Sequence, residues 1–169
     1  MLYLREANIE DIEKEYEYIR DLPLDENGFV NRFHGLSFEE FRDVVLPRYI
    51  NHAKGIDLPE NRSPQIELFL WDDDKIVGLF RLRYNLTKSL IEGAGHIGYG
   101  IKKEYRGRGY ATKGLEMTIK KAWKIISEDE IYMSVNKYNI ASLRTQIKNG
   151  AYIHHENEEQ YFTRIKNNL

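Results

Sequence analysis

The sequence predicts a single domain of the mixed α/β class (α+β), covering residues 1–169, and two observations carry this prediction. First, strand-like apolar runs and helix-like patterns interleave along the chain, in the order β, α, α, β, β, β, α, β, α, β, β. Second, a central apolar run from 96 to 101 passes through Arg106-Gly107-Arg108-Gly109 into a helical pattern that continues to residue 126. A length of 169 residues is typical of one domain.

The composition excludes several functional classes. Twenty-five basic residues against 27 acidic ones leave a charge of −2, which gives no electrostatic case for nucleic-acid binding. No run of 18 apolar residues predicts a membrane span, and the first residues lack the apolar core of a signal peptide. The absence of cysteine excludes disulfides, thiolate metal sites and cysteine nucleophiles. We therefore expect a metal-free, cytoplasmic protein.

The N-terminal part of the chain predicts one strand and two helices. The first five residues form a short strand-like run, and Asn8 is the expected N-cap of an amphipathic helix. Residues 20–35 contain a proline and two glycines, and are expected to form a loop. Ser37 and Glu40 have the spacing of a capping box before a second helix, which Pro47 should kink or split.

The middle of the chain predicts an antiparallel hairpin. Residues 66–71 and 76–86 alternate as strands do, and a short acidic turn joins them. Arg81 and Arg83 fall on the same face of the second strand. Residues 87–95, which include two glycines, are expected to link this hairpin to the central strand.

The C-terminal part predicts a strand, a helix and a final hairpin. After a short strand at 131–135, Asn139 is the expected N-cap of a helix, and Gly150 stands where a left-handed C-terminal cap would be. The last hairpin is expected from residues 151–155 and 161–165. The expected apolar face of the helix is made by Ile140, Leu143 and Ile147.

The segment from the central strand to its helix predicts an anion site built from backbone. The first N–H groups of a helix have no internal partner, and the helix dipole places partial positive charge there. Gly107 and Gly109 leave room for a phosphate, while Arg106 and Arg108 add positive charge. The P-loop spacing is absent, and the dinucleotide fingerprint G-x-G-x-x-G fails at Thr112.

The spacing that does fit is R-x-x-G-x-A, formed by Arg106, Gly109 and Ala111. It resembles the pyrophosphate loop of the GNAT superfamily of N-acetyltransferases, which binds the diphosphate of acetyl-CoA. Asn139 with Ser142 is similar to the family's N-x-x-[SA] pattern at the mouth of the fifth strand.

Two further features extend this resemblance along nearly the whole chain. Gly150 follows Asn139 by eleven residues and is followed by the aromatic Tyr152, where family members commonly have Gly-Phe. The run that begins His96-Ile97-Gly98-Tyr99 resembles a bacterial branch of predicted acetyltransferases. The order of the expected elements is also similar to that of the GNAT fold.

The resemblance implies a mostly antiparallel mixed sheet with helices on both faces and a splay between its fourth and fifth strands. The pantetheine arm of acetyl-CoA would lie in this splay. Segment 96–126 would bind the pyrophosphate, and segment 20–64 would wall the acceptor side. The implied cofactor-binding residues are Gly100, Ile101, Lys102, Arg106, Gly107, Arg108, Gly109, Tyr110, Ala111, Thr112, Asn139 and Ser142.

The implied reaction is transfer of an acetyl group from acetyl-CoA to a primary amine, with a small molecule as the favoured acceptor. Acetylation of a protein N-terminus or lysine is one alternative, and a non-catalytic acyl-CoA-binding module is another. Because relatives are commonly dimers, a homodimer is one assembly that the resemblance implies.

The catalytic side chains differ from the family pattern. The family's acid position, usually tyrosine, holds Gln146, and its usual glutamate base position holds Gly95. His96 adjoins the base position and is the expected base, with Glu92 as its competitor, while Tyr138 is the expected acid. The remaining candidates are Glu67 or water as the base, and Tyr99 or Tyr152 as the acid.

Overall fold

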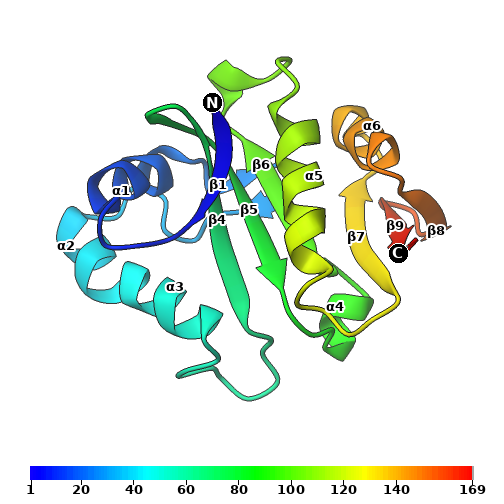
Figure 1. Ribbon diagram of the computed structural model, residues 1–169, viewed down its shortest axis with the longest axis horizontal. Helices are drawn as coiled ribbons and strands as arrows, with labels where there is room; N and C mark the ends of the chain where they lie inside the picture. The colour runs from blue at the N-terminus through cyan, green and yellow to red at the C-terminus, as the bar shows by residue number, and fades with distance from the viewer. Residues whose placement is uncertain (169) are drawn as a thin grey trace.

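The computed structural model describes residues 1–168 and confirms the mixed α/β class (Figure 1). Its main sheet has the strand order β1-β4-β5-β6, and a second sheet has the order β7-β9-β8. All of their pairings in the described residues are antiparallel. The strands are β1 (Leu2–Glu6), β4 (Gln65–Asp72), β5 (Lys75–Arg83), β6 (Ile97–Ile101), β7 (Glu130–Asn136), β8 (Tyr152–Glu156) and β9 (Gln160–Lys166).

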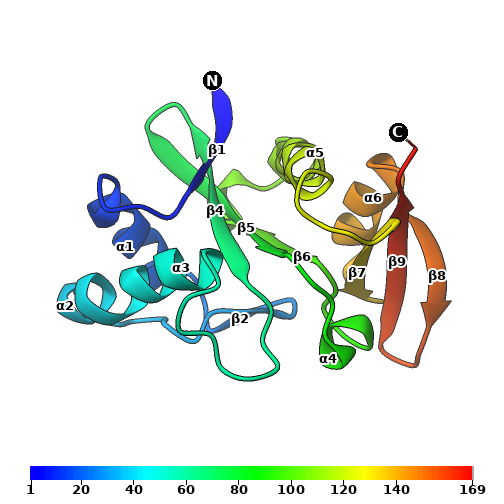
Figure 2. The same ribbon diagram turned by 60° about the horizontal axis from the view of Figure 1, so that its bottom comes forward.

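The two sheets meet where β6 begins. An isolated bridge pairs Gly95 with Met133, and the His96 N–H donates to the Tyr132 carbonyl at 2.7 Å. Beyond this point no ladder joins β6 to β7 in the described part of the chain, so the strands leave a gap (Figure 2). This gap is the splay that the family resemblance implied.

Helices cover both faces of the main sheet (Figures 1 and 2). The residues of β4 alternate between the two cores: Leu68 and Leu70 face α5 (Tyr110–Ala122), whereas Phe69 and Trp71 face the N-terminal helices. Each fully buried side chain of this kind contributes about 1.5–3 kcal/mol to folding. The N-terminal helices are α1 (Ile12–Asp21), α2 (Phe38–Glu40) and α3 (Leu46–Ala53).

The helix α5 lies very close to the sheet because of one glycine. A methyl group at Gly114 would lie 2.3 Å from Cζ of Phe80, a distance that real contacts do not allow. The residue therefore sets how near α5 and its N-terminus can approach β5 and β6. The α-helix itself ends at Ala122, four residues before the end of the predicted pattern.

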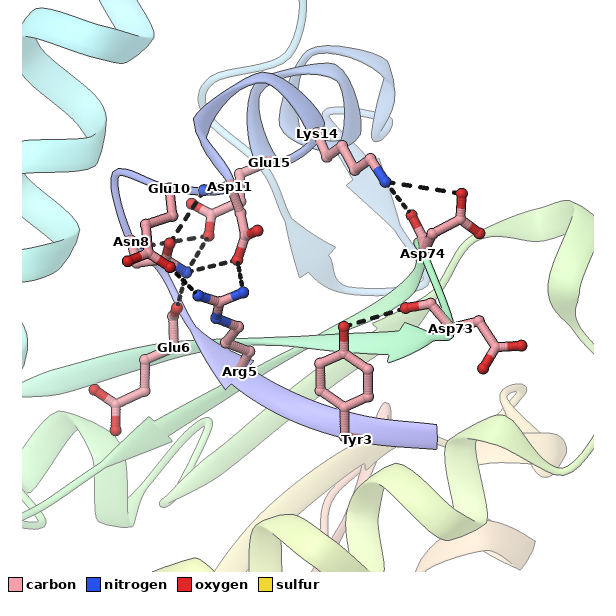
Figure 3. Close-up of polar contacts among 10 residues, drawn as sticks. All are labelled: Tyr3, Arg5, Glu6, Asn8, Glu10, Asp11, Lys14, Glu15, Asp73 and Asp74. Atoms are coloured by element: carbon pink, nitrogen blue, oxygen red, sulfur yellow. Dashed lines mark hydrogen bonds and ion pairs between the residues drawn. The ribbon is translucent and has the colours of Figure 1, made fainter. Parts of the chain in front are cut away.

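The first helix begins later than predicted. Its N-cap is Asp11, and the Asn8 side chain instead accepts the Asp11 N–H at 3.1 Å, which caps the preceding turn. The Asn8 N–H donates to the buried carboxylate of Glu15 at 3.0 Å. Figure 3 shows this network above β1, where Arg5 also pairs with Asp11 at 2.9 Å.

Two segments expected to be loops contain structure. Residues 20–35 hold a hairpin of two-residue strands, β2 (Asp25–Glu26) and β3 (Phe29–Val30). Residues 87–95 hold the one-turn helix α4 (Lys88–Ile91), which Thr87 caps. Elements this short show no hydrophobic period, so the sequence pattern does not reveal them.

The capping box at Ser37 and Glu40 is confirmed, and Pro47 does split its helix. A π-helical segment, Phe41–Val45, comes between α2 and α3, and Pro47 lies in the first turn of α3. Proline has no N–H to donate, so continuous α-helical bonding is interrupted at Pro47, next to the π-helical segment.

The predicted apolar face of the last helix, α6 (Ile140–Lys148), is wrong. Ile140 and Ile147 are 56% and 49% exposed, whereas Thr145 and Gln146 are buried. The helix packs on the second sheet through a polar contact, in which the Thr163 hydroxyl donates to Gln146 Oε1 at 2.5 Å. Its predicted caps are confirmed: Asn139 accepts the Ser142 N–H, and Gly150 has φ of +90°.

Candidate active site

A cleft of about 690 Å³ opens at the gap between β6 and β7. One wall is β6 with the loop that follows it, and the opposite wall is formed by β7 and the start of α6. The β2–β3 hairpin contributes a third side. None of the described helices is long and apolar enough to cross a membrane.

One end of the cleft is a set of free backbone donors. A short 3₁₀ turn (Lys103–Tyr105) leads into Gly107 and Gly109, which have φ of +76° and +82° and so adopt the left-handed conformation that favours glycine. The first helical bond of α5 runs from the Lys113 N–H to Gly109 O. Within the described residues, the N–H groups of residues 107–112 therefore have no acceptor. Such a set of free N–H groups at a helix N-terminus suits an anion.

The two arginines of this loop have different roles. Arg106 donates from Nε to Ile101 O at 3.0 Å and from a terminal nitrogen to Glu26 at 2.8 Å. Its charge is therefore compensated, and its side chain ties the loop to β6 and to the hairpin. Arg108 is exposed, and its guanidinium lies 5.8 Å from the ring centroid of Tyr105. Anion binding at this loop thus depends mainly on backbone.

The pairing register of β6 with β5 determines which backbone groups of β6 face the gap between β6 and β7. Arg83 N donates to His96 O at 2.8 Å and Lys102 N donates to Val77 O at 3.0 Å, so the even-numbered residues of β6 bond to β5. The backbone groups of Tyr99 and Ile101 consequently face the gap. Of the three residues expected to bind the pantetheine arm here, Ile101 faces it, whereas the backbone groups of Gly100 and Lys102 face β5.

The side chain of Tyr99 crosses from β6 to α6. Its hydroxyl lies 2.8 Å from Ser142 Oγ, and its ring stacks on Phe80 with centroids 5.3 Å apart. Burial raises the pKa of Tyr99 to about 12, so the hydroxyl stays protonated at neutral pH. Gln146, at the family's acid position, lines the same part of the cleft.

The other wall provides Asn139 at the N-terminus of α6. Its side-chain oxygen accepts the Ser142 N–H at 3.3 Å, which leaves the amide nitrogen without a partner among residues 1–168. Asn139 and Ser142 both line the cleft. That they flank the pantetheine arm, as the family resemblance implies, stays a prediction.

The structure does not place His96 in the cleft. His96 is fully buried, with Nδ1 accepting the Tyr132 N–H at 2.9 Å and Nε2 lying 3.3 Å from Glu128. Burial lowers the pKa of His96, against the opposing effect of Glu128. With both ring nitrogens directed at partners where the two sheets meet, this geometry suits a structural histidine rather than a base.

The other two expected catalytic residues also lie outside the cleft. Glu92 is exposed at the C-terminal cap of α4. Tyr138 is 69% exposed, and its hydroxyl accepts from the Asn136 side chain at 3.0 Å. No sequence pattern distinguishes these residues from Tyr99, because which side chains enter the cleft depends on the sheet register and on the position of α6.

The β2–β3 hairpin closes one side of the cleft. Phe29 packs over the two glycines of β6: a methyl group at Gly100 would lie 3.3 Å from its ring. At the hairpin turn, the Asn136 side chain donates to Asn27 O at 3.2 Å, which connects the hairpin to β7. A side chain at Gly100 would therefore press on the Phe29 ring, whereas at Gly98 the nearest ring atom would lie at an ordinary contact distance of 3.9 Å.

The charges of the cleft suit an anionic ligand. Of the charged side chains that line it, one is acidic and four are basic: Glu26, Arg81, Arg83, Arg106 and Lys148. In residues 1–168, no group of three or more His, Asp or Glu side chains could hold a metal ion.

Comparisons with known proteins agree with this geometry. The sequence profile of the acetyltransferase (GNAT) domain matches residues 2–152. The fold is similar to a GNAT-family acetyltransferase from Streptococcus pneumoniae, at 19% identity, with 99% of this chain and 100% of that chain covered and a TM-score of 0.65.

Several similar structures contain ligands, and two of them serve as examples. One is the Campylobacter jejuni N-acetyltransferase PseH in complex with acetyl coenzyme A, at 15% identity, with 98% and 99% of the two chains covered and a TM-score of 0.61. The other is spermidine N-acetyltransferase from Vibrio cholerae with CoA and spermine, at 16% identity, with 98% and 95% covered and a TM-score of 0.64. None of the curated proteins matches the sequence. Because the domain profile covers most of its length, the chain belongs to the GNAT family of acetyl-CoA-dependent N-acetyltransferases.

Proposed function

We propose that this protein transfers an acetyl group from acetyl-CoA to the primary amine of a small molecule. The observation that carries the proposal is the continuity of the cleft, which runs from the free N–H groups of residues 107–112 along the open edge of β6. The N–H groups would bind the diphosphate, and the gap would hold the pantetheine arm. Tyr99 and Ile101 would bond this arm from one side and Asn139 from the other.

The open edge of β6 also supports the acyl-transfer step. When the amine attacks the thioester, negative charge develops on the carbonyl oxygen, and a backbone N–H of β6 that faces the gap can donate to it. The amine must first lose a proton. Among the described residues that line the cleft there is no histidine, and the single acidic side chain, Glu26, is paired with Arg106. We therefore propose that the proton leaves to water.

In this proposal, Tyr99 takes over the role of the tyrosine that family members usually have at the position of Gln146. Its pKa of about 12 lies above that of a thiol, near 8.5, so a proton shared with the leaving thiolate would remain mainly on the phenol. Tyr99 would then stabilise the thiolate as a hydrogen-bond donor. The contact with Ser142 orients its hydroxyl.

A small acceptor is supported by the hairpin, which covers the acceptor side of the gap and contacts both β6 and β7. A protein acceptor would have to insert a lysine or N-terminus beneath it. The presence of Gln146 at the family's acid position instead favours the second candidate function, an acyl-CoA-binding module without turnover.

Two measurements test the proposal. Titration calorimetry with acetyl-CoA should show binding, and binding should weaken strongly for pantetheine, which lacks the diphosphate. Release of free thiol in the presence of a panel of amines should then show turnover. Binding without turnover would support the acyl-CoA-binding module, and an absence of binding at millimolar acetyl-CoA would refute both functions.

A further inference from the structure

Two arginines lie side by side at the acceptor end of the cleft. Arg81 and Arg83 project from the same face of β5, and both line the cleft. Arg81 also donates to Val30 O of the hairpin at 2.7 Å, and its guanidinium lies 4.3 Å from the ring centroid of Phe29. The acceptor amine would therefore enter beside two positive charges.

Only one of these charges is compensated by the protein. Glu67 is buried and pairs with Arg81 at 3.2 Å. The side chain of Gln65 lies between this pair and Arg83: its amide donates to Glu67, and its oxygen accepts from Arg83 Nε at 3.1 Å. The second partner of Arg83 is the Gly95 carbonyl at 3.3 Å. Within residues 1–168, no carboxylate lies at ion-pair distance from Arg83.

This arrangement leaves a partly buried cation at the edge of the cleft without an anionic partner. Burial lowers the pKa of Arg83 to about 10, and the like charge of Arg81 acts in the same direction, whereas the charge of Glu67 opposes it. A partly buried cation that has only neutral hydrogen-bond partners is less stable than one paired with an anion. The guanidinium also retains a terminal NH₂ group with no partner among the described residues, and its side chain borders the cleft.

The phosphates of the cofactor are not placed to supply this anion. Arg83 is opposite His96 in the sheet register, whereas the loop with the free N–H groups follows Ile101. Five residues of extended strand separate these positions, which corresponds to about 17 Å. Arg83 thus lies at the opposite end of β6 from the proposed diphosphate site.

We propose that the acceptor amine carries a carboxylate or phosphate group, and that Arg83 binds this group. The inference rests on the proposed acetyl transfer, because it assigns the substrate class of the same cleft. A guanidinium suits both oxyanions, since its planar set of donors matches two oxygens at once. A polyamine, by contrast, brings further positive charge toward Arg83, which has no carboxylate partner in residues 1–168.

The first test compares acceptors with the unmodified protein. Thiol release is measured with β-alanine, 2-aminoethyl phosphate, propylamine and 1,3-diaminopropane at saturating acetyl-CoA. We expect kcat/KM for at least one anionic amine to exceed that for propylamine by about tenfold or more, as for a charge-assisted hydrogen bond. The better of the two anionic amines identifies carboxylate or phosphate as the group. Equal or higher kcat/KM for propylamine or 1,3-diaminopropane would overturn the inference.

The second test removes the charge. Arg83→Gln should lower kcat/KM for the anionic amines by about 10- to 100-fold and leave propylamine nearly unchanged, because only the anionic group loses its partner. Arg83→Lys should restore part of the loss. Arg48→Gln, an equal charge change at an exposed position of α3, is the matched control and should have no effect. An unchanged preference in a folded Arg83→Gln protein would refute the role of Arg83.

Calorimetry with acetyl-CoA separates the two levels of the proposal. If acetyl-CoA does not bind, the proposed function fails and the acceptor inference falls with it. If acetyl-CoA binds and is turned over but the anionic amines are not preferred, the acetyl transfer stands and only the acceptor class is wrong.

Discussion

The buried carboxyl group of Glu15 should make the protein less stable as pH rises. Glu15 is fully buried on α1, where Oε1 accepts the Asn8 N–H at 3.0 Å (Figure 3). Its other oxygen has no hydrogen-bond partner among the described residues. Burial is the main cause that raises the pKa of Glu15 to about 8, and the nearby charge of Asp11 adds to it.

The sign and size of the effect follow from linkage between protonation and folding. Below pH 4.5 the group is protonated in both the folded and the unfolded chain, so its contribution to stability is fully present. Between pH 4.5 and about 8 only the unfolded chain releases the proton, which lowers the free energy of unfolding. Each pH unit costs about 1.4 kcal/mol, so the loss reaches about 3 kcal/mol at pH 7.

The substitution Glu15→Gln tests this because it keeps the shape and the acceptor for Asn8 but does not titrate. We expect it to raise the free energy of unfolding by about 2–3 kcal/mol at pH 7 and by less than about 1 kcal/mol at pH 5. Urea unfolding followed by circular dichroism at pH 5, 6, 7 and 8 measures both values. Glu13→Gln, on the exposed side of the same helix, is the control. A difference between Glu15→Gln and the unmodified protein that stays constant with pH would refute the reasoning.

Three further predictions concern two residues of the cleft and the buried His96. Gly109→Val should abolish acetyl-CoA binding in calorimetry, because the valine side chain would fill the open space where the phosphates are proposed to bind. Gly35→Val is the control for backbone strain of about 1–3 kcal/mol, since Gly35 also has a positive φ and open space around it. Equal acetyl-CoA binding by the two variants would mean that the phosphates bind elsewhere. Tyr99→Phe should lower kcat by about 10- to 100-fold with little change in acetyl-CoA affinity, and an unchanged kcat would remove its hydroxyl from the reaction. His96→Ala should lower the free energy of unfolding by about 2–4 kcal/mol, because it leaves a cavity and an unpaired Tyr132 N–H. If a folded His96→Ala variant instead lost the acidic limb of the pH–rate profile, His96 would be identified as the catalytic base.

The sequence by itself determined the features that depend on near neighbours in the chain. The capping box at Ser37, the cap at Asn139 and the glycine turn before α5 each involve residues within a few positions of one another. The same holds for the long strands β4 and β5, whose pattern is visible over eight or nine residues. Local patterns of this kind specify backbone conformation. They were therefore enough to reveal the family resemblance and to predict the free N–H groups at the N-terminus of α5.

Only the tertiary structure decided which side chains the cleft contains and which charges are compensated there. Arg106 is paired with Glu26 from a hairpin 80 residues away, whereas Arg83 is left with neutral partners because Gln65 lies between it and Glu67. Tyr99 reaches α6 while His96, three residues earlier, is enclosed by the second sheet. These outcomes depend on strand register and on contacts between distant segments, and no spacing along the chain encodes the distance between two such side chains.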